Sequence, residues 1–219
     1  MAHDHHDHDH DHDHDHDEGH EHEHELTDAE ARAEAERLVR RDVALAQIRQ
    51  YGDPVLRMRA AEVETFDDEL ARVTERMKLL MHDADGVGLA ATQVGILRRF
   101  FVATLDGEDH VLVNPVVTAV GSVVDVDQEG CLSLGPIRLP VERAARVMVE
   151  AKDETGEPVT VELEGAAARV VQHELDHLDG TLIIDRTDPE ARHGLLTRGR
   201  GAGAAARAPR GALPGRCGR

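Results

Sequence analysis

The spacing of apolar and polar positions divides the middle of the chain into helices and strands. Apolar residues recur at helical spacing from Phe66 to Met81 and through residues 165–178, which predicts two amphipathic helices. Residues 100–105 and 111–120 are rich in β-branched and aromatic side chains, so we expect a strand over each. Pro115 marks an irregularity or an edge in the second of them.

Two further segments, 147–151 and 159–163, alternate apolar and polar residues with period two. Thr155-Gly156 lies between them, so the pair is predicted to form a β-hairpin. Gly180 is expected to end the helix over 165–178. Because the strands cluster between helices without regular βαβ alternation, the pattern indicates an α+β fold with small mixed or antiparallel sheets.

The N-terminal part of the chain shows a helix start. Thr27-Asp28-Ala29-Glu30 resembles a capping box, which predicts a helix through about Ala46. The compact domain is expected to begin near Ile48, with a turn at Gly52-Asp53-Pro54. We therefore divide this region into a helical extension over 26–46 and a catalytic domain over 47–196.

Both ends of the chain have a composition unlike the middle. Residues 1–25 alternate His with Asp or Glu and are expected to be a disordered tail, either simply solvated or able to collect extra divalent metal ions. Residues 197–219 are rich in Gly, Ala and Arg. They are expected to form a flexible tail, and the abrupt change in composition also suggests out-of-frame translation.

The overall composition excludes several classes of protein. The 219 residues leave room for one domain with a core, and 40% of them are hydrophobic. The net charge is −19, but eleven of the 44 acidic residues lie in the first 25, so the remainder is moderately acidic and no nucleic-acid partner is expected. Two cysteines argue against a disulfide scaffold. Without a signal peptide or a long apolar run, the chain is expected to be cytoplasmic and not to enter a membrane.

The strongest local chemical signal is His173-Glu174-Leu175-Asp176-His177 on the helix over 165–178. A spacing of four puts both imidazoles on one face, where they can hold one metal ion. Glu174 can then act as general base on a water bound to the metal, whose pKa the ion lowers to about 7. Two surface histidines on a charged helix are the alternative.

A catalytic metal site needs a third protein ligand and an open position. Cys131, in Glu129-Gly130-Cys131-Leu132-Ser133, is the candidate because a thiolate binds Fe²⁺ or Zn²⁺ well. Taken alone, Cys131 could equally be an ordinary buried thiol.

A third segment, Gly86-Val87-Gly88-Leu89-Ala90-Ala91-Thr92-Gln93, fits the loose G-x-G-x-x-[G/A] dinucleotide pattern. That pattern requires a preceding strand, whereas an amphipathic helix precedes this one, so we reject nucleotide binding. Two alternatives stay open. The segment is a glycine turn leading into a packed strand, or Gly88 allows close approach of a substrate and Gln93 donates a hydrogen bond.

Together the segments GVGLAATQ, EGCLSL and QHELDHLDG resemble the three signature motifs of the peptide deformylase family, in the same order and at compatible separations. The resemblance extends from about Ile48 to Thr187. It implies small β-sheets packed around a central metal-binding helix that carries HExxH. It also implies hydrolysis of the N-formyl group of newly made N-formylmethionyl proteins, near the ribosome exit.

The resemblance assigns a role to each matching residue. Cys131, His173 and His177 would bind one divalent metal ion, with Fe²⁺ expected and Zn²⁺, Ni²⁺ or Co²⁺ as alternatives. Glu174 would take and return the proton of the attacking water that the metal binds. Gln93 and the backbone N–H of Leu132 would donate hydrogen bonds to the oxyanion. Gly88 and Arg138 would bind the peptide.

The chain departs from the family at Gly135-Pro136, where Pro more often comes one residue earlier, and its C-terminal helix is expected to be cut short after Leu196. Three other functions remain. A zinc peptidase would use Asp179 or Asp185 as third ligand but leaves Cys131 without a role. A metal-storage protein would use the N-terminal histidines. A catalytically inactive relative is the third, although Glu174 and Gln93 are both present.

Overall fold

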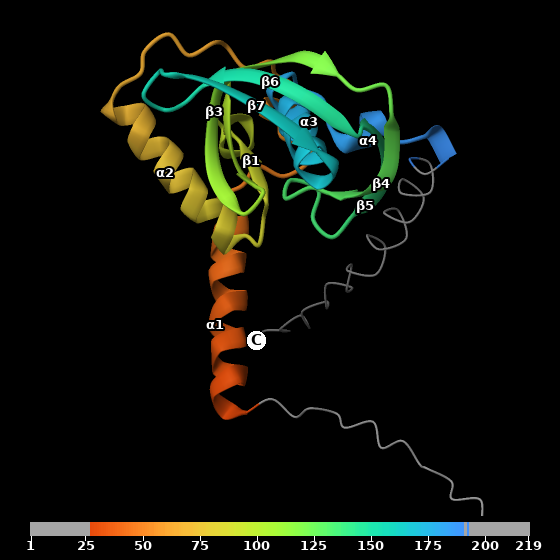
Figure 1. The fold of residues 1–219 in the computed structure, drawn as a ribbon. Helices are drawn as coiled ribbons and strands as arrows, with labels where there is room; N and C mark the ends of the chain where they lie inside the picture. Colours follow the sequence, from red (N-terminus) through yellow and green to blue (C-terminus); the bar gives the residue numbers. More distant parts are fainter. Residues whose placement is uncertain (1–26, 191, 193–219) are drawn as a thin grey trace, which may run out of the picture.

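The computed structural model describes residues 27–190 and 192 (Figure 1). The predictions for the tails 1–25 and 197–219, and for the helix shortened after Leu196, lie outside the described residues. Within the part that is described, no helix is both long and apolar enough to cross a membrane.

Two antiparallel sheets form the β structure. The larger has the strand order β1-β2-β3-β6-β7, and the smaller pairs β4 with β5. The strands are β1 (Gly88–Ala90), β2 (Phe100–Leu105), β3 (Glu108–Val120), β4 (Val124–Gly130), β5 (Arg138–Ala144), β6 (Arg146–Lys152) and β7 (Pro158–Glu164). The predicted strands and the hairpin are confirmed, whereas β4 and β5 were not predicted.

The described helices are α1 (Asp28–Leu45), α2 (Asp68–Asp83), α3 (Gly165–Leu178) and α4 (Ile183–Arg186), with 3₁₀ turns η1 (Pro54–Arg57) and η2 (Ala91–Val94). Of these, α2 and α3 pack on opposite faces of the larger sheet, whereas α4 contacts β5 of the smaller one. α3 contacts four strands of the larger sheet and also β5, so it lies between the two sheets. α2 packs on β1 and β2, and α1 projects away from the rest of the molecule (Figure 1).

The strand β2 shows why its sequence is apolar on both sides. Phe101 and Ala103 belong to the hydrophobic cluster that includes the buried face of α3. Phe100 and Val102 belong to the cluster that includes α2. Because neighbouring residues in a strand point to opposite faces, a strand covered on both sides has no polar alternation. The α+β class predicted from the sequence is confirmed.

The irregularity predicted at Pro115 is present in β3. The register of β3 against β6 shifts between Val113 and Val116, and Asn114 has a φ of 53°. The Asn114 side chain accepts a hydrogen bond from the N–H of Val63 at 2.8 Å and donates one to its carbonyl at 2.9 Å. The break in β3 therefore fastens the segment before α2 to the sheet.

Gly180 ends α3, as predicted. Its φ is +74°, a region that favours glycine, and a Cβ there would lie 2.7 Å from the carbonyl oxygen of Arg57. The chain can therefore turn closely past η1 at this point. The preceding turns of α3, which contain His173 and His177, are fixed against both sheets.

Candidate metal centre

α3 places the two histidines predicted as ligands on one face. The rings of His173 and His177 are edge to face, with centroids 4.9 Å apart. His177 is 1% exposed, and its carbonyl accepts a hydrogen bond from Thr92 of η2 at 3.2 Å. The helix spacing of four residues thus brings both rings into the interior, beside the segment that contains Gln93.

Cys131 comes from a distant part of the chain, directly after β4. Its Sγ lies 3.3 Å from Nε2 of His177, and one potential ligand atom from each of Cys131, His173 and His177 lies within 4.8 Å of the others. The thiol is free and buried. The structure therefore brings together the three residues that the sequence nominated as ligands.

Other contacts of these residues test whether they suit a metal ion. Nδ1 of His173 is hydrogen-bonded to Glu129 Oε2 at 2.9 Å, which leaves Nε2 for a ligand, as is usual for metal-binding histidines. Nδ1 of His177 is buried without such a partner among the described residues. Burial lowers the pKa of His177 well below its usual value, which favours the neutral ring that metals bind. One thiol and two imidazoles suit Fe²⁺ or Zn²⁺.

Glu174 lies beside this cluster and is only 3% exposed. Burial disfavours the charged carboxylate and raises the pKa of Glu174 to about 7. Its Oε2 is buried and has no hydrogen-bond partner among the described residues. A Cβ on Gly88 would lie 2.3 Å from Glu174 Oε1, so glycine is the residue that lets β1 pass this carboxylate.

Gln93 reaches the cluster from η2. Its Nε2 donates to Ser133 Oγ at 3.1 Å and lies 3.9 Å from Cys131 Sγ, while its Oε1 accepts from the N–H of Ala90 at 2.9 Å. Ser133 belongs to the EGCLSL motif, and the sequence alone indicates no role for it. Its hydroxyl orients the Gln93 amide toward the thiol.

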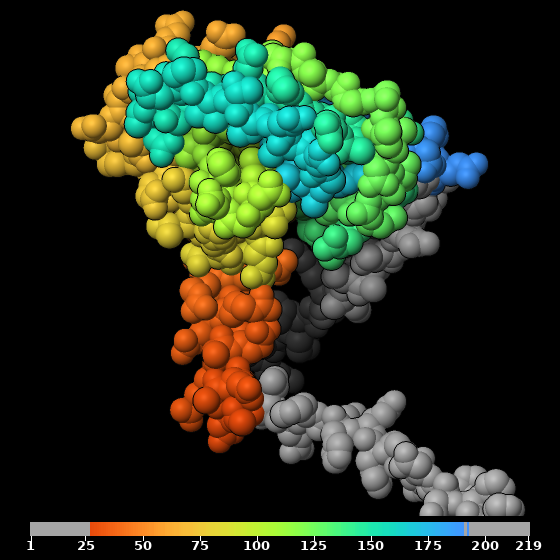
Figure 2. All heavy atoms as spheres, in the orientation of Figure 1, coloured from red at the N-terminus to blue at the C-terminus, as the bar shows by residue number. Residues whose placement is uncertain are grey.

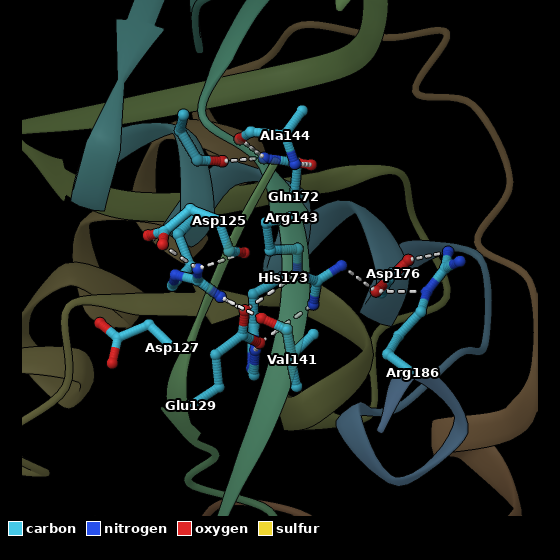
Figure 3. Close-up of polar contacts among 12 residues, drawn as sticks. Asp125, Asp127, Glu129, Val141, Arg143, Ala144, Gln172, His173, Asp176 and Arg186 are labelled. Atoms are coloured by element: carbon cyan, nitrogen blue, oxygen red, sulfur yellow. Dashed lines mark hydrogen bonds and ion pairs between the residues drawn. The ribbon is translucent and has the colours of Figure 1, made fainter. Parts of the chain in front are cut away.

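A buried ion-pair network supports α3 and the end of β4 (Figure 3). Arg143 of β5 makes two hydrogen bonds to Glu129, at 2.9 and 3.0 Å, and one to Asp176 at 2.6 Å. Arg169 also binds Glu129, and Arg186 binds Asp176 with two hydrogen bonds. We use the name buried ion-pair network for Glu129, Arg143, Arg169, Asp176 and Arg186.

The network sets the charge beside His173. Burial tends to raise the pKa of Glu129, but hydrogen bonds from His173 and Arg143 outweigh it and lower that pKa to about 2. Burial tends to lower the pKa of His173, and its hydrogen bonds with Cys131 and Glu129 outweigh this and raise it to about 10. The sequence does not reveal this network, because Glu129, Arg143 and Asp176 come from three separate elements and share no common spacing.

A cleft of about 490 Å³ opens onto the site. It holds the candidate substrate residues Gly88 and Arg138 together with Gln93, Leu132 and Glu174, and α1 supplies part of its wall. The carbonyl of Leu132 accepts a hydrogen bond from Gln50 at 3.2 Å. A second hollow of about 510 Å³ is lined by Arg59, Arg99 and Asp179 among others. Because it contains none of Cys131, His173 and His177, we place the chemistry in the first.

Comparison with known proteins gives a consistent result. The family model described as polypeptide deformylase matches residues 45–193. Peptide deformylase from Thermotoga sp. (strain RQ2) is 49% identical over 152 residues, which are 69% of this chain and 92% of that one. Peptide deformylase from Acidothermus cellulolyticus is 48% identical over 150 residues, 68% of this chain and 83% of that one.

Solved structures agree. The crystal structure of peptide deformylase from Thermotoga maritima has a TM-score of 0.64 and 49% identity, covering 65% of this chain and 97% of that one. The enzyme from Synechococcus elongatus in complex with actinonin has a TM-score of 0.67 and 40% identity, covering 70% and 85%.

Fold and site together define a metal-dependent hydrolase. The chain belongs to the peptide deformylase family. Its activity is the hydrolytic removal of the formyl group from nascent formylated peptides. The resemblance seen in the three sequence motifs is thereby confirmed, and the zinc-peptidase and metal-storage alternatives are set aside.

Proposed function

We propose that Cys131, His173 and His177 hold one divalent metal ion, most suitably Fe²⁺, on a central helix, α3. The proximity of one sulfur and two imidazoles, all within 4.8 Å, is the observation that carries this proposal. When bound there, the ion supplies Lewis acidity, which polarises a carbonyl oxygen and makes water a better nucleophile at neutral pH.

Glu174 acts as the general base and acid of the reaction. It takes a proton from the water that attacks the formyl carbon and delivers it to the departing amine. Its burial, its raised pKa and the unpartnered Oε2 support this role, because such a carboxyl group can exchange a proton near neutral pH.

Gln93 and the N–H of Leu132 stabilise the negative charge that develops on the formyl oxygen. The support is the place of both residues on the cleft and the 3.9 Å separation of Gln93 Nε2 from Cys131 Sγ. Removing one such donor typically costs about 10²–10³ in rate. Gly88 and Arg138, also on the cleft, bind the peptide that follows the formyl group.

The protein works in the cytoplasm on chains that leave the ribosome, because the formyl group is on the first residue to emerge. The division into a helical extension over 26–46 and a catalytic domain over 47–196 remains our proposal. It is supported by a family match that begins at residue 45.

The test is deformylation of formyl-Met-Ala-Ser by protein purified without oxygen, combined with metal analysis. Anaerobic handling matters because a thiolate and Fe²⁺ are both open to oxidation. We expect one tightly bound ion per chain and release of formate. Cys131→Ser is expected to weaken the metal or change its preference, and unchanged occupancy would remove Cys131 from the ligand set.

Glu174→Gln separates the base from the ligands. The amide keeps the shape of the side chain but cannot accept the proton, so we expect kcat to fall by about 10²–10⁴ with metal content unchanged. Glu142→Gln, an exposed position on β5, is the matched control. Wild-type turnover by Glu174→Gln would refute the base assignment.

A further inference from the structure

Helix α1 reaches the cleft although almost all of it lies outside the family match. The match begins at residue 45, the last residue of α1. Arg41 and Leu45 nevertheless line the same cleft as Cys131, His173 and Glu174. Figure 2 shows α1 projecting from the body of the molecule, with its C-terminal end against it. We call Arg41 and Leu45 the α1 wall of the cleft.

Packing fixes the C-terminal end of α1. Ala44 and Ile48 are 2% and 3% exposed and belong to the hydrophobic cluster that includes Met77, Leu80 and Met81 of α2. Leu45 packs partly against the same cluster. The α1 wall is therefore held by core contacts, and its side chains have a defined position at the cleft.

Two ion pairs fasten α1 to the loop before β1. Arg37 Nη1 and Arg41 Nε lie 2.5 and 3.1 Å from the same oxygen, Asp85 Oδ2. Asp85 has a φ of 56° and stands directly before Gly86, in the segment that leads to Gly88. Both arginines hold this loop, but only Arg41 lines the cleft.

The charge of Arg41 is only partly used by this contact. A guanidinium has five N–H donors, and within residues 27–190 and 192 the sole ionic partner of Arg41 is Asp85, through Nε. The Arg41 side chain is 40% exposed. Arg138, the other arginine on the cleft, forms no ion pair in the described part of the chain, and Asp85 is shared by two arginines. At this end of the cleft, the guanidinium N–H donors of Arg41 and Arg138 therefore outnumber the oxygens of the one exposed carboxylate, Asp85, and are available to an acidic ligand.

We propose that the α1 wall is a specificity element for the peptide that follows the formylated methionine, and that Arg41 favours acidic over basic side chains there. The inference rests on the proposed function. With the formyl group at Glu174, the rest of the peptide must leave through the cleft that Arg41 and Leu45 line. Arg41 contacts substrate away from the reacting atoms, so it acts on binding.

The experiment measures kcat and KM for formyl-Met-Ala-Ser and for a set of formylated peptides of four residues. In each peptide of this set, one position after the methionine (the second, third or fourth) carries Glu, Gln or Lys. At one of these positions we expect kcat/KM for Glu to exceed that for Lys by about twofold to fivefold, the size of an exposed charge pair. The difference should lie in KM and should shrink at high salt. Arg41→Ala should abolish the preference, Arg41→Glu should invert it, and Arg41→Lys should retain it.

Arg37→Ala is the matched control, because Arg37 binds the same carboxylate oxygen without lining the cleft. It should keep the preference and the parent activity. If Arg37→Ala and Arg41→Ala lose the preference equally, the effect runs through the Asp85 loop and the specificity role is wrong. If every peptide is deformylated with the same kcat/KM whatever its charge, the specificity role of Arg41 is wrong, and the proposed function stands. No turnover of any peptide would remove the proposed function and the inference with it.

Discussion

The buried ion-pair network behind His173, which we call the floor, and the α1 wall of the cleft both depend on shared carboxylates, but in opposite surroundings. On the floor, Arg143 and Glu129 are each 5% exposed, and they meet within the buried ion-pair network. At the wall, Arg41 and Asp85 are 40% and 41% exposed. Charges withdrawn from water are costly to unpair, whereas exposed pairs contribute little. The comparison indicates that geometry is fixed at the floor and that the wall can change with little loss of stability.

The largest expected effect on stability comes from the buried arginine. Arg143→Met leaves Glu129 and Asp176 with fewer partners in a buried site, so we expect a loss of about 3–5 kcal/mol in the free energy of unfolding. Arg186 binds the same Asp176 but its side chain is half exposed, so Arg186→Met should cost less than about 1 kcal/mol. Urea unfolding of metal-loaded protein measures both, and equal losses would contradict the contrast.

Gly88→Ala tests how tightly β1 passes the Glu174 carboxylate. The new Cβ would lie 2.3 Å from Glu174 Oε1, so the carboxylate or the strand must move. A displacement of about 1 Å at a catalytic group can cost about 10² in rate, and we expect a fall in kcat of that order. In a Glu174→Gln background the same substitution should cost much less, because it acts through Glu174. Full additivity in this double-mutant cycle would show that Gly88 acts by another route.

Glu129→Gln tests the contact between the network and His173. The amide keeps the shape but loses the charge that holds Nδ1 of His173, so metal affinity should weaken by about 10–100-fold. Competition with a chelator gives this affinity directly. Glu142→Gln, exposed on β5, should leave it unchanged. An unaltered affinity in Glu129→Gln would mean that His173 needs no orienting partner.

The elements that the sequence could predict are those whose residues form a local pattern along the chain. The strand over 100–105 and the helix over 165–178 agree with β2 and α3. β2 is a run rich in β-branched and aromatic residues, and the apolar residues of α3 recur at helical spacing. β4 was missed although valines alternate with aspartates at its start, because aspartate is rare in strands and five of the first six residues are exposed and belong to no apolar face of the core. The motifs located His173 and His177 because their spacing of four is local on α3, whereas Cys131 was found only through its own motif, EGCLSL.

Ion pairs between residues that are far apart in the sequence show no such local pattern. Arg143 joins Glu129 and Asp176 from three separate elements, and nothing in the spacing of these residues indicates that they meet. The same holds for Arg41 and Asp85, which lie on α1 and on the loop after α2. Their pairing depends on how helices and strands pack, which periodicity does not reveal.

The smallest expected effects compare the caps of two helices. Thr27 caps α1 in a capping box with Glu30, and Asp67 caps α2 by accepting from the N–H of Leu70 at 2.9 Å. Alanine at either cap removes about 1 kcal/mol from its helix. α2 is packed on the sheet along its length, so Asp67→Ala should lower the global free energy of unfolding by about that amount. α1 is buried only at Ala44, near its other end, so Thr27→Ala should fray the first turn and leave global unfolding unchanged. Amide hydrogen exchange of the first turn of α1, measured beside urea unfolding, distinguishes the two. A global loss in Thr27→Ala would show that the whole of α1 folds as one unit with the floor, and that the α1 wall is less independent than its exposed ion pairs indicate.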